Sequence, residues 1–145
     1  GNRRLVGINR TRVSKPDDPV LCIPQAEFHS PVRAALDRIQ DEIEDVRGVL
    51  VFGSVARGNA DRASDIDIQI IVNDDLTQAR RELHDIRQQI GRQRFDGERY
   101  GLQLLVESIG SAESYGEKLQ EIFSEGITLR ETNKLDDVRE AVFHG

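Results

Sequence analysis

The chain has 145 residues, which suits one compact domain, and its net charge of −6 argues against sequence-independent nucleic-acid binding through a basic face. A single cysteine excludes an internal disulfide, and no apolar run approaches the roughly 20 residues that a membrane span needs. We therefore expect a cytoplasmic protein. Three lysines stand beside 17 arginines and 26 acidic residues, a composition that suits either a salt-adapted (halophilic) surface or an ordinary acidic protein.

The first 26 residues contain three prolines among mixed polar residues and predict a linker, or the remnant of an upstream domain. Within them, Val20–Ile23 could form one short strand. The chain starts at Gly1 and contains no methionine, so either a start residue was removed or this is a fragment of a longer protein, and the fragment is the favoured alternative. The folded domain is expected over residues 27–145.

Ser30 and Pro31 predict the start of a helix, with serine as the N-cap and proline at the first helical position. This helix is expected to end near Arg47 and Gly48. The elements expected after it are strands at 49–52 and 65–72, a helix at 76–94, a strand at 100–106, a helix at 111–124, an edge strand at 127–129 and a short helix at 134–143. This order predicts an α/β fold, a small mixed β-sheet with helices packed on it, in which a parallel crossover joins the second and third strands.

Asp65 and Asp67 are candidate metal ligands at the start of the second predicted strand. Strand side chains alternate between faces, so both carboxylates should share one face while Ile66 and Ile68 enter the core. Two carboxylates on one face repel each other unless a cation lies between them or one of them takes up a proton. Mg²⁺, or Mn²⁺ in its place, suits such oxygen ligands and commonly retains a substrate phosphate.

Gly53 and Ser54 follow the first predicted strand and are candidate phosphate ligands. The missing side chain of Gly53 lets a ligand approach the backbone, and Ser54 offers a hydroxyl and an N–H at the start of a short predicted helix ending at Arg57. Phosphate donors beside a metal are the minimal apparatus for moving a nucleotidyl group.

The segment as a whole, Gly-Ser, ten residues, then Asp-Ile-Asp, resembles the signature of the DNA polymerase β superfamily of nucleotidyltransferases, especially its minimal nucleotidyltransferases. The resemblance covers residues 49–72 strongly and 100–129 weakly. It implies that Gly53 and Ser54 bind a nucleoside triphosphate and that Asp65 and Asp67 hold the metal.

Two further residues join the nucleotide-binding candidates. Arg57 either contacts phosphate or forms an ion pair with Asp61 or Asp65, and the ion pair is the favoured alternative. Ser64 precedes Asp65, and a turn or cap role is favoured for it.

The resemblance also implies a third carboxylate on the next strand, and here the sequence departs from the pattern. If the third strand runs parallel to the second, the position beside the two aspartates is Gln103, which can ligate Mg²⁺ but cannot act as a base. Glu107 lies four residues, roughly 13 Å, further along. Glu98 would reach the site only from a short, ordered loop.

Two functions therefore remain. The first is an enzyme that transfers a nucleoside monophosphate from a nucleoside triphosphate to a hydroxyl of a protein, RNA or small molecule. The second, favoured by Gln103, is a catalytically weakened nucleotide-binding or regulatory domain. By resemblance, the partner would be a separate helical protein in a toxin–antitoxin module, or an upstream DNA-binding domain such as a winged helix.

Overall fold

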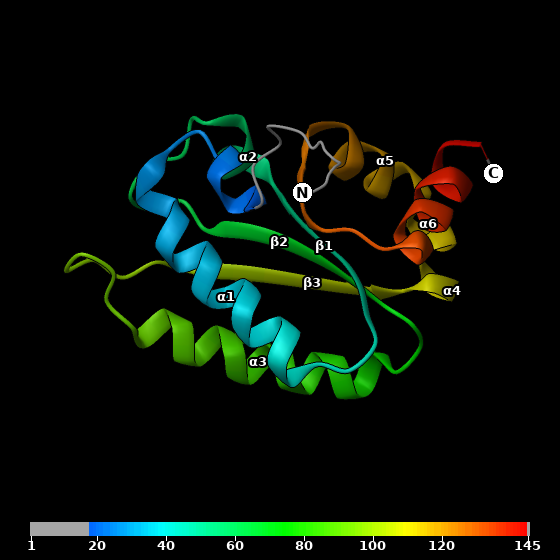
Figure 1. The fold of residues 1–145 in the computed structure, drawn as a ribbon, viewed down its shortest axis with the longest axis horizontal. Coiled ribbons are helices and arrows are strands. Elements are labelled where there is room, and N and C mark those ends of the chain that lie inside the picture. Colours follow the sequence, from blue (N-terminus) through cyan, green and yellow to red (C-terminus); the bar gives the residue numbers. More distant parts are fainter. Residues whose placement is uncertain (1–17, 145) are drawn as a thin grey trace, which may run out of the picture.

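The computed structural model describes residues 18–144, and residues 1–17 of the predicted linker lie outside this range. The protein is an α/β domain built on a four-stranded mixed sheet, which confirms the expected fold class (Figure 1). The strands are β1 (Val46–Phe52), β2 (Ile66–Val72), β3 (Leu102–Ser108) and β4 (Ile127–Arg130). The helices are α1 (His29–Glu42), α2 (Gly53–Arg57), α3 (Leu76–Arg92), α4 (Ile109–Ala112), α5 (Gly116–Glu125) and α6 (Asn133–His144).

The sheet has the strand order β3-β2-β1-β4. β1 pairs antiparallel with both β2 and β4, whereas β2 pairs parallel with β3 through the α3 crossover, as expected. The register places Asp67 beside Phe52 of β1 and beside Gln103 of β3. The end of β1 and the starts of β2 and β3 therefore meet at one edge of the sheet.

Each face of the sheet carries its own core. Alternation along β2 puts Ile66, Ile68 and Ile70 on one face, where they are fully buried with apolar residues of α1 and α3. The opposite face holds Leu50 and Ile71, which pack with residues of α5 and α6. Figure 1 shows α3 along the bottom of the view with α1 descending to it from the upper left, whereas α4, α5 and α6 lie on the right.

Several predicted boundaries are wrong. Pro19–Cys22 form a 3₁₀ helix in place of the expected strand, and Val20 and Ile23 are buried in the first core. α1 begins at His29 and stops at Glu42, because Ile43 is extended and β1 begins at Val46.

The later elements differ less from expectation. The predicted helix at 111–124 is broken into α4, a 3₁₀ turn at Glu113–Tyr115, and α5. β3 runs two residues later than expected, and β2 begins at Ile66, directly after Asp65. Within residues 18–144, no helix is both long and apolar enough to cross a membrane.

Candidate active site

The predicted site residues gather at the edge of the sheet where β1 ends and β2 begins. Gly53 follows β1 directly and has a φ of +71°, a conformation that favours glycine. A Cβ atom placed on Gly53 would collide with Oδ2 of Asp67. The Asp67 carboxylate therefore lies against the backbone of the Gly53–Ser54 turn, in the juxtaposition that the sequence predicts.

The carboxylate of Asp65 lies at the same edge. Its Oδ1 would be 2.5 Å from a Cβ placed on Gly101, which lies two residues before Gln103. Asp65 is exposed, whereas Asp67 is partly buried. The two carboxylates are close enough for the charge of one to act on the other.

Burial raises the pKa of Asp67 above its ordinary value, and the negative charge of Asp65 raises this pKa further. Arg57 and Lys118 lower the pKa of Asp67 and partly offset both effects. A cation bound between the two carboxylates would relieve the same repulsion. The donor set thus fits Mg²⁺, which is commonly held by one or two protein carboxylates together with substrate phosphates.

The third-carboxylate position is Gln103, because its Cα is the register partner of Asp67 on β3. Glu98 is engaged by Arg62 at 2.5 Å, and Oε1 of Glu107 accepts a hydrogen bond from Ser111 Oγ at 2.8 Å. In the described part of the chain, no group of three or more His, Cys, Asp or Glu side chains could hold a metal ion. The site therefore offers two carboxylates and one amide.

The structure gives Ser64 the contacts of a turn residue, and it gives Arg57 an ion pair with a residue other than the expected ones. Arg57 lies at the end of α2, but its carboxylate partner is Glu125 of α5, so the expected ion pair with Asp61 or Asp65 is wrong. Ser64 Oγ accepts a hydrogen bond from the Asp61 N–H at 3.0 Å and contacts the Asp61 carboxylate at 3.2 Å. These bonds agree with the turn role favoured for Ser64.

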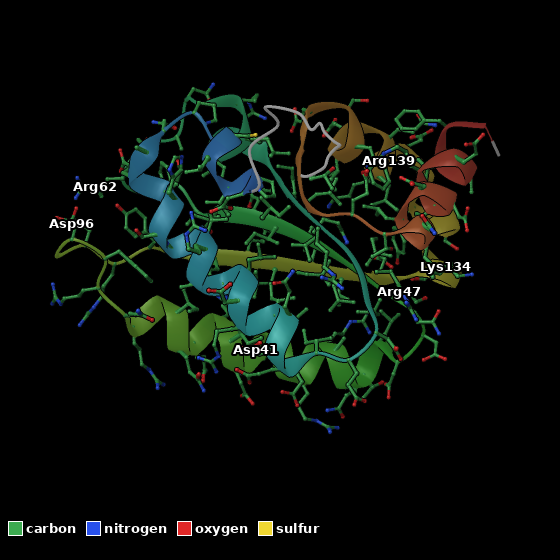
Figure 2. All side chains as sticks on the ribbon, in the orientation of Figure 1. Asp41, Arg47, Arg62, Asp96, Lys134 and Arg139 are labelled. Atoms are coloured by element: carbon green, nitrogen blue, oxygen red, sulfur yellow. The ribbon has the colours of Figure 1, made fainter. Side chains whose placement is uncertain are left out.

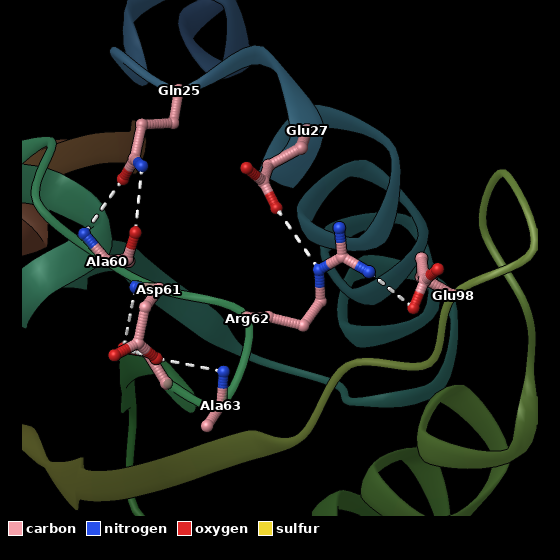
Figure 3. A network of polar contacts seen from close by, with 8 residues as sticks. Gln25, Glu27, Ala60, Asp61, Arg62, Ala63 and Glu98 are labelled. Carbon is pink, nitrogen blue, oxygen red and sulfur yellow. Dashed lines mark hydrogen bonds and ion pairs between the residues drawn. The ribbon is translucent and has the colours of Figure 1, made fainter.

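The signature loop, residues 58–65 between α2 and β2, is braced by residues that the sequence pattern does not indicate. The side-chain amide of Gln25 donates to the Ala60 carbonyl and accepts from the Ala60 N–H, both at 2.9 Å (Figure 3). Arg62 reaches Glu98, with Glu27 4.0 Å away. No spacing signal links Gln25 to a loop 35 residues away, so only the folded structure could reveal this pair.

Figure 2 places Arg62 and Asp96 at one end of the molecule and Lys134 and Arg139 at the other. Arg62 therefore lies far from α6, which carries Lys134 and Arg139.

A cavity of about 360 Å³ lies further along β2 and β3, beyond Asp67 and Gln103, neither of which lines it. Gln69 and Leu105 line it and lie two residues beyond Asp67 and Gln103 on their strands, hence on the same face. Lys118 of α5 lines the cavity as well. The cavity is bounded by β2, β3, α3 and α5, and it begins two residues along the strands from Asp67 and Gln103.

Comparison with known proteins gives the class to which this fold and site belong. The family model of the nucleotidyltransferase domain matches residues 32–136, and the chain belongs to this family. The resemblance that the Gly-Ser and Asp-Ile-Asp signature indicates is therefore confirmed.

Solved structures show the same fold. One is a chain of a toxin–antitoxin crystallised with AMP-PNP, which is 22% identical with a TM-score of 0.55 over 82% of this chain and 85% of that chain. Another is a chain of a mutant toxin–antitoxin MntA–HpeT, 19% identical with a TM-score of 0.54 over 77% of this chain and 82% of that chain. Among curated proteins, no significant match is found.

Proposed function

We propose that the domain binds a nucleoside triphosphate with Mg²⁺ or Mn²⁺ and transfers the nucleoside monophosphate group to a hydroxyl acceptor. The observation that carries the proposal is the Asp67 carboxylate, which lies against Gly53 with Asp65 beside it. Membership of the nucleotidyltransferase domain family supports the same reaction class.

Asp65 and Asp67 would hold the metal, and Gly53 and Ser54 would bind phosphate. The metal would supply charge stabilisation to the transferred group. The acceptor oxygen forms a bond to the α-phosphorus, the bond from that phosphorus to the bridging oxygen breaks, and pyrophosphate leaves. The proton of the acceptor hydroxyl passes to water or to a base on the acceptor, since Gln103 cannot take it.

The second candidate function is nucleotide binding with weakened or absent transfer. The register of Gln103 beside Asp67 favours it, because a carboxylate at this position would add both a metal ligand and a base. The recess lined by Gln69, Leu105 and Lys118 would accommodate part of the nucleotide or of the acceptor under either proposal.

The acceptor and partner are proposed by analogy of fold. Both structural relatives above are chains of toxin–antitoxin assemblies, so a helical partner protein is the first acceptor to test. RNA and a small molecule are the alternative acceptors, and an upstream winged-helix domain is the alternative partner.

One experiment separates the two functions. The protein is incubated with each α-labelled nucleoside triphosphate, Mg²⁺ or Mn²⁺, and a cell extract, while ATP affinity is measured by calorimetry. Label transfer that disappears in Asp67→Asn but persists in Asp85→Asn, a matched change on the exposed side of α3, supports the transferase. Metal-dependent binding without transfer supports the second function. ATP affinity that is unchanged in the double variant Asp65→Ala, Asp67→Ala refutes the site.

A further inference from the structure

Glu125 occupies the donor groups that the proposed triphosphate site would need. Its Oε1 accepts a hydrogen bond from the Gly53 N–H at 3.3 Å and from Arg57 Nη1 at 3.2 Å, and its Oε2 lies 3.4 Å from the same guanidinium nitrogen. The Glu125 carboxylate thus bridges the Gly53 N–H and the Arg57 guanidinium, which are both candidate phosphate-binding groups.

The packing of α5 brings Glu125 to this place. The helix ends at Glu125, and the Gly126 N–H donates to the Ile122 carbonyl at 2.8 Å. A Cβ on Gly126 would lie 2.5 Å from the Ile122 carbonyl oxygen and 3.0 Å from that of Val51. The missing side chain therefore allows the end of α5 to lie directly against β1 at Val51, two residues before Gly53.

A bound triphosphate and the Glu125 carboxylate would compete for these donors. A single N–H makes one strong hydrogen bond, and two anions that share one guanidinium repel each other at close range. The Glu125 side chain is 30% exposed and Arg57 is 49% exposed, so the pair is partly screened and can separate into solvent. Release of Glu125 costs little, and it frees both donors at once.

We propose that Glu125 is an affinity-determining residue that holds the Gly53 N–H and Arg57 in place of phosphate and is displaced when the triphosphate binds. The inference rests on the proposed function. In this proposal Arg57 binds the Glu125 carboxylate in the free protein and a phosphate in the complex. It gives a role to the contact of Glu125 with Gly53.

The test compares Glu125→Gln with Glu121→Gln, which makes the same charge change at an exposed position one turn earlier on α5. Calorimetry with MgATP and with inorganic tripolyphosphate gives the affinities. Glu125→Gln is expected to raise both affinities about three- to fivefold, the range of a partly exposed ion pair. Glu121→Gln is expected to leave them within twofold, and the gain of Glu125→Gln is expected to shrink in molar salt.

A second readout follows the Gly53 amide by NMR. MgATP is expected to shift the Gly53 amide resonance of the wild-type protein. Without any ligand, the Gly53 amide resonance of Glu125→Gln is expected to differ from that of the wild-type protein. If the wild-type protein binds ATP and Glu125→Gln binds it equally or more weakly, the competition is refuted while the proposed function stands. If neither protein binds ATP, the proposed function fails, and the competition fails with it.

Discussion

Replacement of Gly53 by alanine tests the central contact of the site. The φ of +71° costs an L-residue about 1–2 kcal/mol. The new Cβ would also overlap Oδ2 of Asp67, and this oxygen must move by about 1 Å to reach the 3.4 Å of an ordinary contact, which adds about 1 kcal/mol on the scale of overpacking. We therefore expect Gly53→Ala to lower the free energy of unfolding by about 2–3 kcal/mol.

Gly97 provides the matched control. Its φ is +83° and nothing lies within 4 Å of an added Cβ, so Gly97→Ala should cost only the backbone term of about 1–2 kcal/mol. Urea denaturation of Gly53→Ala, Asp67→Ala and the double variant completes a cycle. In the Asp67→Ala background the cost of Gly53→Ala should fall by about 1 kcal/mol, because the overlapping oxygen is gone. A cost equal to that of Gly97→Ala, or one unaffected by Asp67→Ala, would refute the contact.

Three other changes test the site and its support. Gln25→Ala removes both bonds to the Ala60 backbone and should cost about 1–3 kcal/mol, lowering Tm by roughly 2–12 °C in thermal denaturation, whereas Gln40→Ala on the exposed side of α1 should change little. The raised pKa of Asp67 means that its contribution to stability is complete below the ordinary value of 3.8 and is lost as the pH rises through the folded-state pKa. Metal-free Asp67→Asn should therefore match the wild-type Tm at the acidic end of a pH series and exceed it near neutrality, and a wild-type advantage near neutrality would contradict the assigned repulsion. Gln103→Asp supplies a carboxylate beside Asp67 and should increase Mg²⁺ affinity about tenfold in a metal titration, while an unchanged affinity would place this side chain outside the metal site.

The sequence predicts the sheet and its aspartate edge well, because both depend on local patterns. The alternation Ile66, Asp67, Ile68 assigns each side chain to a face without tertiary information, and the structure buries both isoleucines. The parallel pairing that sets Gln103 beside Asp67 follows from a helix long enough to cross over between two strands.

Contacts between distant segments could not be predicted in this way. Val46 fits the apolar spacing of α1, but it belongs to β1, because periodicity cannot decide where a helix stops when the next strand is equally apolar. Glu125 and Gln25 carry no motif, and their roles depend on the close approach of α5 to β1 and of residues 24–26 to the signature loop. Arg57 illustrates the consequence, since its charge is evident from the sequence but its partner lies 68 residues away.

Phe52 and Asp67 are register partners in the antiparallel pairing of β1 with β2. The chain between them therefore leaves the sheet and returns to it at the same pair of residues. Extra residues added between Gly58 and Ser64 would extend the loop outward and leave the pairing of Phe52 with Asp67 unchanged. Loss of Ile66 from the start of β2 would instead move Asp67 to the face that packs against α1 and α3, and Ile68 to the face of the proposed site. A change of length in this loop therefore leaves the register of the sheet unchanged, and its cost falls on the contacts of Ala60 and Arg62.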